Sequence, residues 1–129
     1  MNRERTPAAY ERAWQRPDEQ EKVRGWVQEC WTSTSTYVNP LTDMVQGVDG
    51  LTRLIVDYPL LFPDVEIRRM GEPEAIDGYV RSSSRLSSSA RIRMLGRDFG
   101  HVLDGTDIIE FTAEGAIRTV VSLFGSATG

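Results

Sequence analysis

Apolar residues in the first half of the chain recur with the period of an α-helix. The spacing predicts helices over residues 8–15 and 19–31, because their apolar side chains return at helical intervals and so share one face. A third helix is predicted over residues 48–62, directly after Gly47, and we expect Pro59 to kink it or end its regular part. The clearest stripe, which we expect to be core, consists of Val23, Trp26, Val27, Cys30 and Trp31.

The second half of the chain has the composition and the alternation of β-strands. Between the two halves, residues 32–36 are rich in Ser and Thr and are interpreted as a turn, followed by a short strand at Tyr37 and Val38 that Pro40 stops. Helices followed by antiparallel strands predict an α+β domain, with the helices covering one face of a curved sheet. The later strands are predicted over residues 65–70, 76–86, 90–95, 102–112 and 116–124.

Length and composition narrow the class of protein. A chain of 129 residues is the usual size of one domain, so we expect a single domain over residues 1–129, with residues 1–6 and 126–129 as loose tails. The net charge of -4 argues against a nucleic-acid partner, which normally meets a basic face. No apolar run approaches the ~20 residues of a membrane span, and no secretory signal is evident. A lone cysteine, Cys30, fits a reducing cytoplasm.

The rarest residue types exclude most cofactor chemistry. The chain has one histidine, His101, one cysteine, Cys30, and one lysine, Lys22. A zinc site of His and Cys needs three or four ligands, and Lys22 lies in a polar helical stretch unsuited to a Schiff base. No nucleotide-binding loop or nucleophile motif is present, so we expect no metal, flavin, nicotinamide or PLP. A Cys30/His101 nucleophile pair remains a minor alternative to a buried structural cysteine.

Strand parity predicts a small-molecule pocket. Tyr37 and Asn39 are two residues apart and therefore face the same way, and the same argument applies along each later strand. A concave face that is mostly apolar, with a few polar groups, is the usual make-up of a ligand site. The predicted ligand-binding residues are Trp31, Asn39, Tyr58, Arg81, Ser83, Val120, Ser122 and Phe124. For Arg81 the alternative is a structural ion pair with Asp77, Asp107 or Glu74.

Four residues are candidates for acid/base chemistry. Asp107 is predicted to be a general acid or oxyanion donor, or else a solvated carboxylate at a strand start. Tyr37 is predicted to orient the substrate or to be a core aromatic. His101 and Asp98 lie in a loop that we expect at the pocket mouth, and either is a candidate base if the loop folds over the pocket.

Several short pieces of the chain occur in a characteristic order, and they are Trp14, 30–32, 37–40, Gly47, 62–64, 80–81, 105–107, 114–117 and 123–125. On these pieces the chain, from about Tyr10 to Gly125, resembles the SnoaL-like branch of the NTF2-like superfamily. The resemblance implies a cone of three helices on a strongly curved, mostly antiparallel sheet, and a homodimer through the outer sheet face. The superfamily includes isomerases, dehydratases, polyketide cyclases, epoxide hydrolases and binding proteins.

Individual positions match the superfamily unevenly. In ketosteroid-isomerase-like members the general base is an Asp that precedes a proline, and this chain has Asn39 at that position. Those members also have a protonated Asp that donates a hydrogen bond to the substrate oxyanion, and Asp107 matches it. In limonene-epoxide-hydrolase-like members, Tyr37, Asn39 and Arg81 match residues that orient water. Serines, Ser83 and Ser122, stand where those members have carboxylates.

These patterns lead to two functional hypotheses. The first is a cofactor-independent acid/base enzyme, of isomerase, cyclase or dehydratase type, that acts on a hydrophobic polyketide-, steroid- or terpenoid-like molecule. Asp107 is then the acid or oxyanion donor, and His101 or Asp98 is the base. The alternative is a binding protein without catalysis, which the missing carboxylates at Asn39, Ser83 and Ser122 favour.

Overall fold

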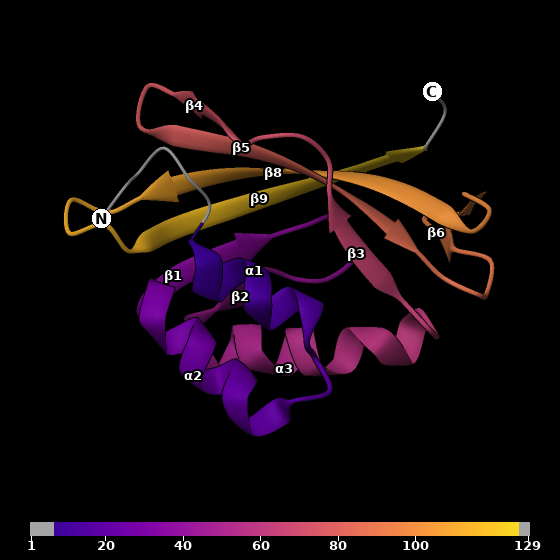
Figure 1. Ribbon diagram of the computed structural model, residues 1–129, viewed down its shortest axis with the longest axis horizontal. Helices are drawn as coiled ribbons and strands as arrows, with labels where there is room; N and C mark the ends of the chain where they lie inside the picture. The colour runs from indigo at the N-terminus through magenta and orange to yellow at the C-terminus, as the bar shows by residue number, and fades with distance from the viewer. Residues whose placement is uncertain (1–6, 127–129) are drawn as a thin grey trace.

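A computed structural model describes residues 7–126 and shows three helices packed on one face of a curved sheet (Figure 1). The helices are α1 (Ala8–Gln15), α2 (Gln20–Cys30) and α3 (Gly47–Leu61). Pro59 lies in the last turn of α3, which ends two residues later. Among the described helices, none has the length and apolar character that a membrane span requires. The predicted α+β class, with helices first and strands after, is confirmed.

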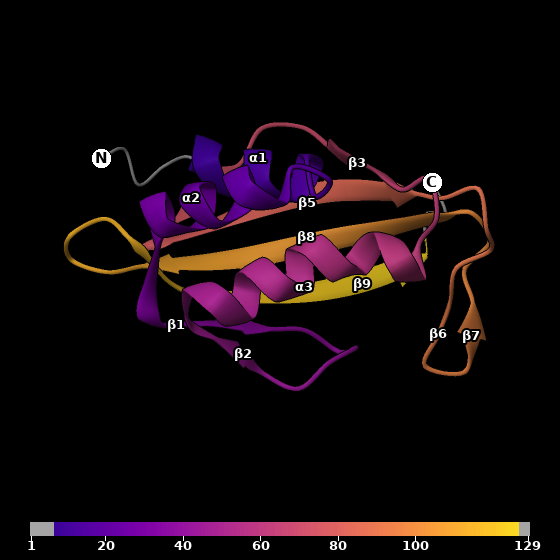
Figure 2. The same ribbon diagram turned by 90° about the horizontal axis from the view of Figure 1, so that it is seen from below.

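The main sheet has the strand order β2-β1-β9-β8-β5-β3, with β4 paired to β5. All its pairings are antiparallel except that of β1 with β9, so the predicted mostly antiparallel sheet is confirmed. A separate hairpin, β6 with β7, lies at one end of the sheet (Figure 2). The strands are β1 (Trp31–Val38), β2 (Val45–Gln46), β3 (Glu66–Arg69), β4 (Glu74–Ile76), β5 (Tyr79–Ser87), β6 (Arg93–Met94), β7 (Arg97–Asp98), β8 (Val102–Phe111) and β9 (Ile117–Ser126).

The hydrophobic core fills the space between the helices and the inner face of the sheet. The stripe predicted for α2 supplies fully buried Val23 and Val27, while α3 supplies Leu51 and Ile55. A second, smaller core forms where the β6–β7 hairpin meets the sheet. The space left between these two cores is where the candidate site lies.

Residues 32–36 are part of β1, so their interpretation as a turn was wrong. The Ser35 hydroxyl is buried and donates to the Ile117 carbonyl oxygen at 2.6 Å, and the hydroxyls of Thr36 and Thr119 lie 3.2 Å apart. Both partners belong to β9, some eighty residues along the chain. A Ser/Thr-rich stretch therefore becomes a strand because a distant strand satisfies its hydroxyls.

Three predicted boundaries also change. Asp77 and Gly78, with φ of 38° and 88°, make a two-residue turn that divides the strand predicted over 76–86 into β4 and β5. Asp-Gly is a strong signal for this tight hairpin. Only Arg93–Met94 of the strand predicted over 90–95 pairs. Ser126 ends β9 and is not part of a tail, while the other predicted tail residues, 1–6 and 127–129, lie outside the described residues.

Candidate functional site

A cavity of about 180 Å³ lies between α1, α3 and the inner face of the sheet. Its walls are largely apolar, and its polar groups come from α1, α3, the sheet and the turn after β1. Apolar side chains that line it include Leu54, Phe62, Ile67, Leu86, Leu103 and Phe124. Of the predicted ligand-binding residues, Asn39, Tyr58, Ser122 and Phe124 line this cavity, as do the predicted catalytic residues Tyr37 and Asp107.

Asp107 and Ser122 form the polar centre of the cavity. They are register partners on β8 and β9, and residues directly opposite in an antiparallel pair project to the same face. The Ser122 hydroxyl donates a hydrogen bond to Oδ1 of Asp107. Burial raises the pKa of Asp107 to about 6, and the hydrogen bond from Ser122 opposes that rise. Asp107 can therefore both gain and lose a proton near neutral pH.

Tyr37 extends from β1 towards the same centre and is buried. Burial raises the pKa of its phenol, the charge of Asp107 raises it further, and a hydrogen bond with Ser122 acts in the opposite direction. The phenol therefore keeps its proton at neutral pH. Tyr37 is a neutral hydrogen-bonding group beside Asp107 and not an acid or base of its own.

Two further groups in the cavity, Tyr10 and Trp14, come from α1 and were not predicted as site residues. The Tyr10 hydroxyl and the Trp14 indole nitrogen are buried, and neither has a hydrogen-bond partner within the described part of the chain. Burial raises the pKa of Tyr10, the charge of Asp107 raises it further, and the facing indole N–H of Trp14 lowers it, so the phenol lies close to both groups, although the two side chains do not meet in a well-formed hydrogen bond. An unsatisfied buried donor costs about 1–3 kcal/mol. A ligand oxygen between these groups would remove that cost.

From the sequence alone, Tyr10 and Trp14 cannot be distinguished from two aromatic residues of a hydrophobic core. Tyr10 and Trp14 are four residues apart on a short helix, and their rings meet edge to face with centroids 6.4 Å apart. Tyr10 also stacks on Trp31 at 6.2 Å. Aromatic residues at helical spacing are usually core, and only their buried donors without partners distinguish these two residues from ordinary core aromatics.

The structure corrects the predicted roles of Trp31 and Val120. Both are buried in the hydrophobic core, and neither is among the residues that line the cavity. Trp31 donates from its indole nitrogen to the carbonyl of Gly47 at 3.1 Å, so its polar group is already satisfied. Tyr58 does line the cavity, and its hydroxyl donates to the Trp14 carbonyl at 2.7 Å, which joins α3 to α1.

Asn39 lines the cavity, but its amide holds a turn. Its oxygen accepts hydrogen bonds from the backbone of Leu41 at 2.9 Å and Thr42 at 3.2 Å, and its nitrogen donates to the Thr42 hydroxyl at 2.8 Å. These contacts shape the chain after Pro40 and leave little of the amide for a ligand. The observed geometry therefore agrees with the turn-shaping alternative for this residue.

Arg81 and Ser83 face away from the cavity, so their predicted placement was wrong. Asp107 on β8 is the register partner of Ser82 on β5, so the Ser82 side chain points to the same inner face as Asp107. The neighbours of Ser82 along the strand, Arg81 and Ser83, therefore point to the outer face. Arg81 forms an ion pair with Glu74 on β4, on the outer side of the sheet. Ser82 and Ser84 line the cavity in their place.

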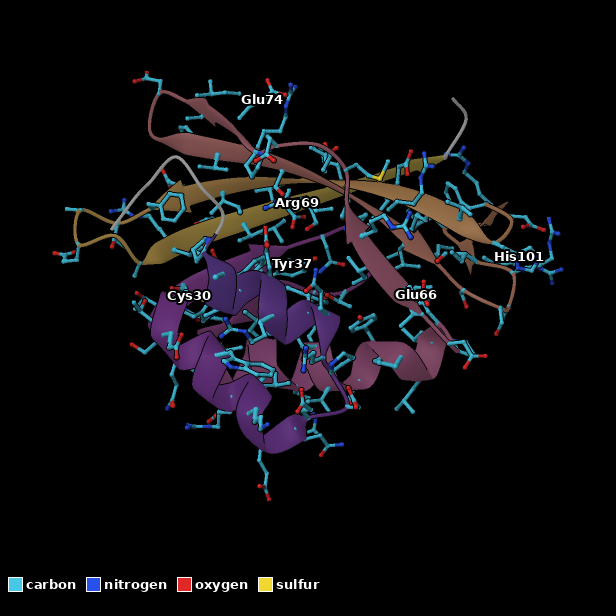
Figure 3. The ribbon with its side chains drawn as sticks, viewed as in Figure 1. Cys30, Tyr37, Glu66, Arg69, Glu74 and His101 are labelled. Atoms are coloured by element: carbon cyan, nitrogen blue, oxygen red, sulfur yellow. The ribbon has the colours of Figure 1, made fainter. Side chains whose placement is uncertain are left out.

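His101 and Asp98 also lie away from the cavity, which corrects their prediction as replacement bases. His101 lies at the end of the sheet near the β6–β7 hairpin, away from Tyr37 at the centre (Figure 3). Its Nδ1 is 3.3 Å from the Ser88 carbonyl. Asp98 pairs with Arg91 at 2.9 Å, and this hydrogen bond is the main reason its pKa is lowered. The loop is held at this end, so neither residue reaches Asp107.

One ion pair lies at the cavity wall. Nη1 of Arg69 on β3 is 3.1 Å from Oε1 of Glu11 on α1, and both residues line the cavity. The side chains are 42% and 28% exposed, so this pair forms part of the mouth. Apart from Asp107, these are the charged residues of the cavity within the described part of the chain.

The comparisons with known proteins concern fold first. No family model matches the chain, and no curated protein matches it. A SnoaL-like family protein from Agrobacterium tumefaciens, provisionally assigned as an isomerase, is 27% identical over 92% of each chain, with a TM-score of 0.76. A SnoaL-like protein from Jannaschia, provisionally assigned as a polyketide cyclase, is 18% identical over 90% of this chain and 82% of its own, with a TM-score of 0.62.

A third solved structure is a protein of ketosteroid-isomerase-like fold from Catenulispora acidiphila in complex with trimethylamine. It is 11% identical over 95% of this chain and 88% of its own, with a TM-score of 0.64. These matches, together with a protein from Exiguobacterium described as NTF2-like, show that the chain has an NTF2-like fold. The chain is similar to SnoaL-like proteins provisionally assigned as an isomerase and as a polyketide cyclase, which confirms the resemblance seen in the sequence.

Proposed function

We propose that this protein is a cofactor-independent acid/base enzyme that shifts a proton on a hydrophobic, enolisable carbonyl compound, in the manner of an isomerase or cyclase. The observation that carries the proposal is the buried Asp107, with a pKa of about 6, near the unpartnered donors of Tyr10 and Trp14. Enzymes that move protons tune a carboxylate towards neutral pH by burial in this way. The similarity to SnoaL-like proteins assigned as isomerase and cyclase supports the same class.

In the proposed reaction, the carboxylate of Asp107 removes a proton from the carbon next to the substrate carbonyl. The C–H electron pair forms the enolate double bond, and the carbonyl π pair moves onto oxygen. The Tyr10 hydroxyl and the Trp14 indole nitrogen donate hydrogen bonds to that oxygen, where negative charge develops. Where the substrate also has a carbon–carbon double bond next to the deprotonated carbon, the intermediate is a dienolate. Its oxygen electron pair re-forms the carbonyl, the double bonds shift by one position, and the terminal carbon takes the proton back from Asp107, so the protein ends the cycle unchanged.

This role for Asp107 differs from the one predicted from the sequence. With a pKa of about 6, the carboxylate outnumbers the acid by about ten to one at pH 7, so the group begins as a base. The hydrogen bond from Ser122 stabilises that charged form. Because His101 and Asp98 lie elsewhere, the proposal assigns both removal and return of the proton to Asp107.

A non-catalytic binding protein is the second candidate. The observation that favours it is the amide of Asn39, which occupies the base position of ketosteroid-isomerase-like enzymes and is held in a turn. The cavity then has one buried titratable carboxylate and not two. Under this alternative, ligands bind in the same place, but no proton exchange follows.

The two candidates are separated by solvent-deuterium exchange into 2-tetralone, a small enolisable ketone, followed by NMR. The wild-type protein is expected to accelerate exchange, and Asp107→Asn to reduce that acceleration by about 10²–10⁴-fold. Asp104→Asn is the matched control, because Asp104 lies on the outer face of the same strand and pairs with Arg85. Equal exchange by wild type and Asp107→Asn would favour the binding protein.

A further inference from the structure

A second group of polar side chains lines the cavity, on β3 and β5. Ser82 is the register partner of Asp107, Ser84 lies two residues further along β5, and Arg69 is the register partner of Ser84 on β3. All of these residues line the cavity. We call Arg69, Ser84 and Ser82 the β3–β5 polar strip. It leads from Asp107 to the Glu11–Arg69 pair at the mouth.

Several hydrogen-bond donors of the β3–β5 polar strip are available to a ligand. Within residues 7–126, the hydroxyls of Ser82 and Ser84 make no hydrogen bond, and the Arg69 guanidinium makes a single one, from Nη1 to Glu11. A guanidinium can donate two parallel hydrogen bonds to one carboxylate. Glu11 is partly exposed, so an incoming anion can take its place on Arg69 while Glu11 turns to solvent.

We propose that the β3–β5 polar strip is an anion subsite, and that the substrate is a compact keto acid whose carboxylate binds Arg69 and Ser84. This inference rests on the proposed function, since the reacting carbonyl is the one held at Tyr10 and Trp14. The remaining walls of the cavity are largely apolar, so the body of the molecule is hydrocarbon. The strip thereby selects for substrates that carry a negative charge at one end.

The spacing of the strip limits the size of the substrate. Arg69 lies two strands away from Asp107 across the sheet and two residues further along it. Neighbouring strands are ~4.8 Å apart and each residue advances a strand by ~3.3 Å, so the backbones of Asp107 and Arg69 are about 12 Å apart. Both side chains extend inward and shorten that gap. An engineered cavity of ~150 Å³ holds benzene. At about 180 Å³, with a mouth at exposed Arg69, this cavity suits one or two rings with a polar group at each end.

The test compares two fluorescent ligands that differ only in the carboxylate, 2-naphthol and 6-hydroxy-2-naphthoate. Their binding is measured by titration calorimetry and by quenching of tryptophan fluorescence, because Trp14 lines the cavity. Wild type is expected to bind the naphthoate about tenfold more tightly than 2-naphthol. Arg69→Gln should remove that preference and change 2-naphthol affinity by less than about twofold.

Arg68→Gln is the matched control. Arg68 is the neighbouring arginine on β3, is exposed, and does not line this cavity, so neither affinity should change. Arg69→Lys should restore part of the preference, because it keeps the charge and loses the paired geometry. Ser84→Ala should weaken the naphthoate by about threefold and leave 2-naphthol unchanged. Circular dichroism confirms that each variant is folded.

Three results would overturn the inference. They are an equal effect of Arg69→Gln on both ligands, no effect on either, and failure of the naphthoate to bind the wild type. The proposed function is judged separately, by exchange into uncharged 2-tetralone. If the protein accelerates exchange into 2-tetralone but does not prefer the naphthoate, only the anion subsite is rejected. If it prefers the naphthoate but does not accelerate exchange, it is an anion-selective binding protein and the catalytic proposal is rejected.

Discussion

Ser122 on β9 donates a hydrogen bond to Asp107 on β8, and the two residues are register partners in the sheet. This pairing places a hydroxyl against Asp107, the carboxylate that is buried in the cavity within residues 7–126. Burial favours the neutral form of Asp107, and the hydroxyl favours the charged form. The balance between these two effects leaves the pKa of Asp107 at about 6 and within range of neutral chemistry.

Removal of the Ser122 hydroxyl should raise the pKa of Asp107 further. Ser122→Ala takes away the hydrogen bond that lowers this pKa, while the burial that raises it remains. The change is followed by NMR titration of the Asp107 carboxyl carbon and by the pH–rate profile of 2-tetralone exchange, whose acidic limb should move to higher pH. Ser83→Ala, on the outward face of β5, should move neither. An unchanged pKa in Ser122→Ala would contradict the assigned hydrogen bond.

Deprotonation of Asp107 should lower the free energy of unfolding as the pH rises from about 4 to about 6. The pKa of this group is higher in the folded state, at about 6, than the model-peptide value of about 3.9. The folded state therefore binds the proton more tightly, and the stabilisation is complete below pH 4 and lost above pH 6. The shift corresponds to about 2–4 kcal/mol.

This pH dependence is measured as a difference between two proteins. Urea unfolding of wild type and Asp107→Asn at several pH values cancels the contributions of the other carboxylates. The wild type should lose free energy of unfolding relative to the variant between pH 4 and pH 7. A constant difference over this range would mean that Asp107 is solvated and has an ordinary pKa.

Tyr10→Phe should separate stability from activity. The Tyr10 hydroxyl is buried without a partner, so its removal should leave the ligand-free protein equally stable or about 1 kcal/mol more stable. Exchange into 2-tetralone should fall by about 10²–10³-fold, because a donor to the developing enolate oxygen is lost. Thermal unfolding and the exchange assay measure the two effects.

The matched control is Tyr79→Phe. Tyr79 lies on the outer face, where its hydroxyl donates to Glu110 at 3.1 Å. This variant should keep full exchange activity. If Tyr10→Phe instead destabilises the fold and keeps its activity, Tyr10 is a core residue and the donor to the substrate oxygen lies elsewhere.

The homodimer implied by the family resemblance stays a prediction, and the outer sheet face is where it is tested. Leu123 is 58% exposed on this face and lies two residues along β9 from Val121, the register partner of Val38, which is 37% exposed. Leu123→Asp should raise the dimer dissociation constant by at least about tenfold, because it places a charge in the buried contact. Sedimentation velocity measures this. The control is Leu60→Asp, because Leu60 lies at the end of α3 and away from the sheet. A wild-type protein that stays monomeric at high micromolar concentration would contradict the prediction.

Part of the site was predictable from local pattern. The apolar stripe of α2 and the alternation around Asp107 are local properties of the chain, because helix and strand periods fix which side chains share a face. For that reason Tyr37, Asp107, Ser122 and Phe124 were expected on one inner surface, and they line one cavity. The alternatives for Asn39 were also visible, since an Asn before a proline is a common turn residue.

Other parts depended on contacts between distant segments. The short pattern of Arg81 to Ser84 fits either face of β5, and only its register against β8 decides that the serines at 82 and 84 point inward. His101 and Asp98 have side chains suited to catalysis, but the small core under the β6–β7 hairpin holds their loop at the end of the sheet. Residue type alone does not determine where a loop is anchored.

The sequence by itself determined the three helices, the order of helices before strands and the alternation of β8 and β9, because these follow from the residues within a few positions of one another. The tertiary structure decided the register between strands, the burial of Asp107 and the lack of partners at Tyr10 and Trp14. A register shift of one residue turns every side chain of a strand to the opposite face. A buried group acquires its pKa and its unmet hydrogen bonds from neighbours brought together only by folding.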